Sequence, residues 1–303
     1  MKSIRNNVLA LIALYLFSAA PSAFAEAWLQ TPGKLYLKVS GSISESKNEY
    51  NFRGDEQELF FEDGTRSDSK FREIATRVYA EYGLATWLTV VGQLPLKNVR
   101  TWETIVAISN ADPQEAIRTN YGFGDLELHG RVPILRGPLA VATQFGLKIP
   151  LGYDDTPWNE GPALGTGEVD GDIRLAVGRG LDRGWVEISM GYHLRGGPLS
   201  NEWRISTEGG WRPRAKWYAK LRYEGLRNEI SPIDIGGIII ETPAPPGVLN
   251  QVVIGDQDYD ILGGEINYQL TPLWAVSGEA THVLSGKNTL TGTTFQVSLI
   301  YSN

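Results

Sequence analysis

The chain has 303 residues, with 28 lysines and arginines, 35 aspartates and glutamates, and a formal net charge of −7. It contains no cysteine, which excludes disulfides, thiolate metal sites and cysteine nucleophiles. The isoelectric point near 5.2 argues against nucleic acid as a partner.

The first 25 residues have the organisation of an export signal. Lys2 and Arg5 give a positive start, residues 8–17 form an apolar run, and Ala23-Phe24-Ala25 has the small-x-small pattern that precedes cleavage. The apolar run is too short to cross a bilayer as a helix, so an uncleaved anchor is the weaker interpretation. We therefore expect a cleaved signal peptide at 1–25 and one mature domain at 26–303.

About twelve segments of alternating apolar and polar residues follow. A period of two is typical of a strand with one apolar and one polar face. The mean hydropathy of −0.20 fits a membrane barrel, in which only every second strand residue faces lipid. In chain order, the expected strands lie at about 34–48, 69–82, 88–96, 126–132, 139–149, 169–177, 186–194, 203–211, 217–224, 262–270, 274–280 and 295–301.

The connections between these strands are alternately tight and long. The long connections lie near 49–68, 100–120, 151–167 and 227–256. Bacterial barrels have short periplasmic turns and long external loops, and lipid requires a closed sheet. We therefore predict an all-β fold, a transmembrane antiparallel up-and-down β-barrel of about twelve strands in the outer membrane of a Gram-negative-type bacterium. Because the last long connection is ambiguous, ten or fourteen strands stay open.

Six aromatic side chains share the lipid-facing parity and lie beside the proposed periplasmic turns. Amphipathic rings prefer the headgroup level of a membrane. A soluble sandwich or propeller has no reason to place such rings around one edge, which makes it the weaker alternative. The predicted membrane-interface aromatics are Tyr82, Trp211, Trp217, Tyr268, Trp274 and Tyr301.

The opposite faces of the strands carry charges of both signs. They indicate either a hydrated pore whose field selects solutes or a closed lumen filled by cross-strand ion pairs. Nothing in the sequence indicates a plug domain, so we favour a pore, narrower than that of the larger porins. The predicted pore-lining residues are Glu73, Arg77, Glu81, Asp125, Glu127, His129, Arg131, Lys148, Asp170, Asp172, Arg174, Glu187, Arg204, Glu208, Lys220, Arg222, Glu224 and Glu265.

The histidines give no indication of a catalytic site. None of His129, His193 and His282 is followed two positions later by serine, the His-x-Ser spacing of outer-membrane phospholipases. Adjacent strands could still bring a serine and a base together from distant positions. We expect no enzymatic activity and keep a lipase-type barrel enzyme as the third hypothesis.

The loops contain two features of note. Acidic runs, at Glu56/Glu58/Glu62/Asp63, Asp154/Asp155 and Asp256/Asp258/Asp260, could bind divalent cations with lipopolysaccharide, although such runs are more often solvated surface. The apolar loop 235–254 could fold into the barrel mouth or contact a partner, but we favour a hairpin that extends its two strands. No phosphate-binding loop, zinc spacing or EF-hand pattern is present, so we predict no cofactor and no metal.

Short glycine-rich motifs carry a family resemblance. They lie at 122–128 (Gly-Phe-Gly-Asp-Leu-Glu-Leu), 145–152 (Phe-Gly-Leu-Lys-Ile-Pro-Leu-Gly), 165–167 (Gly-Thr-Gly) and 170–173 (Asp-Gly-Asp-Ile). Over about residues 120–300 the sequence resembles the outer-membrane family named for the meta pathway of phenol degradation. The resemblance implies a barrel that moves small, often aromatic or hydrophobic, molecules, with no established catalytic residues.

We therefore expect an outer-membrane channel for passive uptake or release of small solutes. The rival hypothesis is a non-conducting surface barrel whose loops bind a partner or lipopolysaccharide. The expected partners are outer-membrane lipid, lipopolysaccharide and a small-molecule solute. The sequence names neither the solute nor the oligomeric state.

Overall fold

The computed structural model describes residues 26–59, 66–105, 113–155, 161–197, 199–229 and 256–303. The predicted signal peptide 1–25 and the apolar loop 235–254 lie outside the described residues. No helix in the described part is long and apolar enough to cross a membrane. The strands are β1 (Leu35–Ser46), β2 (Asn48–Tyr50), β3 (Glu56–Glu58), β4 (Arg66–Ala85), β5 (Leu88–Ile105), β6 (Gln114–Phe123), β7 (Leu126–Leu135), β8 (Leu139–Ile149), β9 (Asp170–Leu181), β10 (Gly184–Leu194), β11 (Glu202–Arg214), β12 (Trp217–Asn228), β13 (Asp258–Gln269), β14 (Trp274–Lys287), β15 (Thr289–Leu290) and β16 (Thr293–Ser302).

The main sheet is a closed antiparallel barrel. It has 13 strand segments. β1 pairs with β16 on one side and with β4 on the other, and the pairing of β4 with β5 closes the ring. β6 and β7 pair with successive parts of the same strand, β5, so they fill one position between them. The barrel therefore has twelve strand positions, which confirms the predicted fold class and decides the strand count in favour of twelve.

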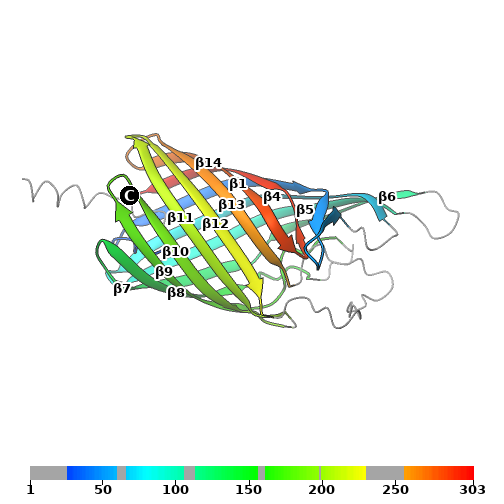
Figure 1. Cartoon of the computed structure of the whole chain (residues 1–303), viewed down its shortest axis with the longest axis horizontal. Helices are drawn as coiled ribbons and strands as arrows, with labels where there is room; N and C mark the ends of the chain where they lie inside the picture. The colour runs from blue at the N-terminus through cyan, green and yellow to red at the C-terminus, as the bar shows by residue number, and fades with distance from the viewer. Residues whose placement is uncertain (1–25, 60–65, 106–112, 156–160, 198, 230–255) are drawn as a thin grey trace, which may run out of the picture.

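The two ends of the barrel differ (Figure 1). Tight connections and the C-terminus lie at one end, on the left of the view, which we call the turn end. At the opposite loop end, β4 and β5 run for 20 and 18 residues and extend past the neighbouring strands together with β6. The prediction of a long loop over 100–120 was wrong, because β5 continues to Ile105 and β6 begins at Gln114. Both faces of this extension carry polar residues, which hides the alternation.

The wall is apolar outside and polar inside. Outward residues such as Val297 and Leu221 are 69% and 60% exposed, whereas the buried set includes Glu81, Arg131 and Glu265. A soluble protein has the opposite distribution. The exposed apolar surface is stable only against an apolar surrounding.

The six predicted interface aromatics all lie on the outer face beside the turn end. Two cross-strand pairs stack there, with ring centroids 4.9 Å apart for Trp217 and Tyr268 and 5.0 Å apart for Trp274 and Tyr301. Tilted ring pairs of this kind stabilise adjacent strands. Their contact with lipid headgroups stays a prediction.

Because the outer face is apolar and the inner face polar, a new charge should lower the stability of the barrel much more on the outer face than on the inner face. Val297→Arg places a cation on the middle of the apolar outer face and should lower the free energy of unfolding by about 2–4 kcal/mol in a bilayer. Ser42→Arg, which faces the interior cavity, should have a much smaller effect. Denaturant titration of both variants in lipid vesicles measures the difference, and equal losses would contradict this assignment of faces.

Candidate functional site

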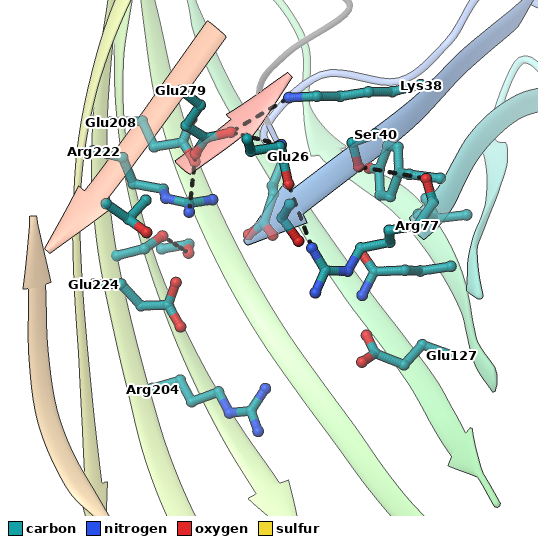
Figure 2. Close-up of a pocket in the computed structure, with 18 of the residues that line it drawn as sticks. Glu26, Lys38, Ser40, Arg77, Glu127, Arg204, Glu208, Arg222, Glu224 and Glu279 are labelled. Atoms are coloured by element: carbon teal, nitrogen blue, oxygen red, sulfur yellow. Dashed lines mark hydrogen bonds and ion pairs between the residues drawn. The ribbon is translucent and has the colours of Figure 1, made fainter. Parts of the chain in front are cut away.

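The inward side chains enclose a cavity of about 610 Å³ within the barrel. Figure 2 shows charged side chains of both signs pointing into it from several strands. Asp125, Lys148, Asp170, Asp172, Glu187 and Glu265 are on the inner face but are not among the residues that line the cavity. The predicted residues that line it are Glu73, Arg77, Glu81, Glu127, His129, Arg131, Arg174, Arg204, Glu208, Lys220, Arg222 and Glu224.

One side of the cavity is built on a chain of ion pairs across β1, β12, β13 and β14. Glu265 is buried and accepts Lys38 at 2.8 Å and Lys220 at 3.1 Å. Arg222 lies 3.3 Å from Glu279, which also lies 3.5 Å from Lys38. Buried charges need such partners, because an unpaired charge loses its hydration without compensation. Sequence reasoning missed Lys38 and Glu279, although their strand parity faces them inward.

The other side, on β7 to β11, is built around two histidines. His193 lies 2.7 Å from Glu202, which also pairs with Arg204 at 2.6 Å. His129 lies 2.8 Å from Asp172. Within the described residues neither histidine is hydrogen-bonded to a serine. These histidines therefore pair with carboxylates of other strands, and no Ser-His pair of the lipase type is formed there.

His282 and the acidic runs lie elsewhere. His282 shares the outward parity and contacts the Thr293 hydroxyl at 2.9 Å. Glu62 and Asp63 lie outside the described residues. In the described ranges, no group of three or more histidine, aspartate or glutamate side chains is arranged to hold a metal ion.

The chain before β1 crosses the lumen at the turn end. We call residues 26–33 the amino-terminal segment. At one side its Gln30 side chain donates to Glu81 at 2.9 Å, and the Gln30 N–H donates to Thr89 at 2.9 Å. At the other side the first two N–H groups of the segment reach Glu187 on β10. The segment therefore occupies part of the lumen at the turn end, although the sequence indicates no plug domain.

Arg131 on β7 fastens the middle of the amino-terminal segment. Its guanidinium donates to the Trp28 carbonyl at 3.1 Å, to Glu81 at 3.2 Å and to Gln144 at 3.2 Å. The side chain is 1% exposed. One fully buried cation thus joins three strands of the wall, β4, β7 and β8, to the segment.

Apolar packing completes the contact of the segment with β8, β9 and β10. The Trp28 ring meets the Trp185 ring edge-on with centroids 6.1 Å apart, and Trp185 donates to the Tyr218 hydroxyl. A Cβ at Gly178 would lie 2.4 Å from the Trp28 ring, so this position has room only for glycine. Next to Trp28, Ala27 packs against two other small residues, Ala140 on β8 and Ala176 on β9.

Glu26 brings the end of the segment to the cavity. Its carboxylate pairs with Arg174 on β9 and lines the cavity with the strand residues, and Figure 2 shows it among them. Sequence reasoning missed the segment because it is too short to form a domain and has no alternation. One feature of the sequence could have predicted it: Trp185 and Tyr218 occupy inward-facing strand positions beside two tight turns. Large aromatic side chains that point into the lumen need a packing partner there.

Comparison with known proteins gives the fold. No family model matches the sequence, and no curated protein matches it. An outer-membrane channel from Pseudomonas putida F1 has a TM-score of 0.64 at 13% identity, covering 94% of this chain and 100% of that one. The NanC porin is more distant, with a TM-score of 0.48 at 7% identity, covering 88% of this chain and 98% of that one. The Ralstonia pickettii toluene transporter TbuX has a TM-score of 0.47 at 8% identity, covering 92% of this chain and 91% of that one. The barrel therefore has the fold of outer-membrane channels.

The Arg131 contacts predict strong coupling to Glu81. Arg131→Met leaves the buried Glu81 carboxylate without its cation and should lower the free energy of unfolding by about 3–5 kcal/mol. The double variant Arg131→Met with Glu81→Gln should recover a large part of that loss, because no unpaired charge remains. Urea unfolding of Arg131→Met, Glu81→Gln and the double variant tests this. If the losses in free energy of unfolding are additive, the two residues act independently.

Proposed function

We propose that the protein is an outer-membrane channel for passive uptake or release of small solutes. A polar, charge-lined cavity inside a barrel with an apolar outer wall carries this proposal. A hydrated interior gives polar solutes a path that the surrounding lipid does not. The turn end would face the periplasm and the extended β4–β5–β6 end the exterior. The predicted pore-lining residues would form the path.

The exposure of the lumen charges favours small organic anions as solutes. The Arg204 and Arg222 side chains are 34% and 31% exposed, whereas their partners Glu202 and Glu279 are 4% and 9% exposed. On these strands a solute meets the guanidinium before the carboxylate. Guanidinium binds carboxylates in a planar fork and stacks on aromatic rings, so aromatic acids fit this chemistry. Glu127, at 37%, balances the field, so the preference for anions is modest.

The motifs of the phenol meta-pathway family support the same class of protein. Lys148 pairs with Asp170 at 2.5 Å, lies 3.5 Å from Asp125, and donates to Thr166 at 2.8 Å. Tyr153 donates to Asp125 and accepts the Gly167 N–H. All these residues except Tyr153 come from the motifs, so the motifs assemble one cluster on the loop-end side of the lumen. We propose membership of that family on this basis.

Lipopolysaccharide is a proposed partner at the outer rim. Lys70, Arg72 and Arg100 surround the Trp102 ring, with their charged groups 5.4, 5.0 and 5.4 Å from its centroid. This outer basic cluster has outward parity and lies next to the exposed apolar Ile74 on β4. Among the described residues, Glu45 is the carboxylate that pairs with it. Three cations with one acid at the edge of an apolar belt fit the phosphates of lipid A.

The rival function is a closed surface barrel, and the amino-terminal segment is the observation that favours it. A barrel crossed by this segment conducts only if a passage remains beside it or the segment moves. Conductance therefore distinguishes a channel from a closed barrel.

The channel proposal predicts discrete single-channel steps with a modest preference for anions in planar bilayers. Arg204→Gln with Arg222→Gln should shift the reversal potential in a salt gradient toward cation preference, because two exposed lumen cations are removed. Arg183→Gln with Lys216→Gln removes the same charge from the tight turns and serves as control. A folded barrel without conductance under any voltage would contradict the channel and support the surface barrel.

The outer basic cluster predicts bound lipopolysaccharide. Lys70→Gln, Arg72→Gln and Arg100→Gln together should strongly reduce the lipopolysaccharide that copurifies with the barrel from outer membranes. The control changes Arg183, Arg214 and Lys216 at the turn end to glutamine, which alters the net charge equally. Mass spectrometry of lipid A per barrel measures the difference, and equal amounts in both variants would contradict this site.

A further inference from the structure

A buried carboxylate receives the first two backbone N–H groups of the amino-terminal segment. The Glu187 oxygens accept the Glu26 N–H at 3.1 Å and the Ala27 N–H at 2.6 Å. Glu187 is 4% exposed. No lysine, arginine or histidine of the described residues forms an ion pair with it, unlike Glu81, Glu202 and Glu265. A buried carboxylate without a cation is unstable unless it is neutralised or paired.

The neighbouring charges do not supply that cation. Glu208 lies directly opposite Glu187 in the β10–β11 register, where like charges destabilise the strand pair. Lys220 is 3.5 Å from Glu208 and also forms an ion pair with Glu265. Arg174 pairs with the Glu26 carboxylate. The group of Glu26, Glu187 and Glu208 is therefore short of one positive charge.

We propose that Glu187 is the binding site for the α-ammonium of Glu26, formed when the exported chain is cut after Ala25. Hydrolysis by an export peptidase consumes one water, leaves the carboxylate on Ala25 and releases the amine of Glu26, which is protonated at neutral pH. The atom now 3.1 Å from Glu187 then carries the missing charge. The inference rests on the proposed cleavage and, for its consequence, on the proposed channel.

The ammonium changes the strength of the contact. An amide nitrogen offers one N–H and no charge, whereas an ammonium offers three donors and a charge-assisted hydrogen bond roughly twice as strong as a neutral one. The contact is buried, so water screens it little. Cleavage therefore fastens the segment across the turn end, and an uncleaved or extended chain has the amide without the charge.

Two changes test this ion pair without removing the segment. The first compares the exported chain beginning at Glu26 with a refolded chain that keeps one methionine before Glu26, both verified by mass. The second is Glu187→Gln in the exported chain, with Glu115→Gln, at an exposed position on β6, as the control for charge. Because the protein has no cysteine, Ala27→Cys in each background gives a single thiol whose maleimide labelling reports release of the segment.

We expect labelling at Ala27→Cys to be about tenfold faster in both the methionine-extended chain and the Glu187→Gln variant, with more frequent or larger open steps in bilayers. Glu115→Gln should match the parent. Unchanged labelling in both altered proteins would overturn the ion pair. If Glu187→Gln does not fold, the extended chain keeps every native side chain and still decides the outcome.

The two readouts separate this inference from the channel itself. Faster labelling without conductance in any protein would confirm the ion pair and contradict the channel. Conductance that is equal in all four proteins, together with unchanged labelling, would support the channel and contradict the ion pair.

Discussion

The closure of the sheet is the constraint on which the rest of the structure depends. An apolar surrounding offers no hydrogen bonds, so each backbone N–H and C=O in the wall must pair with a neighbouring strand. Twelve strand positions satisfy this only as a ring, which β1 completes by pairing with both β4 and β16. The alternation of a strand then assigns every residue to lipid or lumen. The charged interior follows from the ring.

That interior in turn explains why the lumen is dominated by ion pairs. A narrow ring brings inward side chains within reach of one another, so that opposite charges on different strands can pair. Glu265 lies buried between Lys38 and Lys220, and Glu202 lies buried between His193 and Arg204. Such networks stabilise less by their net attraction than by excluding arrangements that would leave a charge alone.

The sequence was informative where a periodic rule applied and silent where contacts were irregular. The twelve strand positions and the inward and outward faces of the strands followed from the period of two. Lys38 and Glu279 obeyed the same rule and were only overlooked. The amino-terminal segment has no period, and its position depends on Arg131, Glu187 and Trp185, which come together only in the closed barrel. The β4–β5–β6 extension was missed because polar residues on both faces erase the pattern.

In the proposed channel, the attachment of the amino-terminal segment would determine how a passage forms beneath the cavity. The segment is continuous with β1 at one end, where Gly33 has a positive φ of 77° and its N–H donates to the Gly83 carbonyl at 2.8 Å. Its other end, at Glu26, is held by an ion pair with Arg174 and a hydrogen bond to Glu187. Release of those two contacts and of the packing of Ala27 against Ala140 and Ala176 would free the tip, while Gln30 and Arg131 keep the base in place. Movement of the tip therefore requires fewer broken contacts than expulsion of the whole segment. In the proposed channel, the pair of carboxylates Glu26 and Glu187 would therefore be the point at which a solute or the voltage acts on the passage.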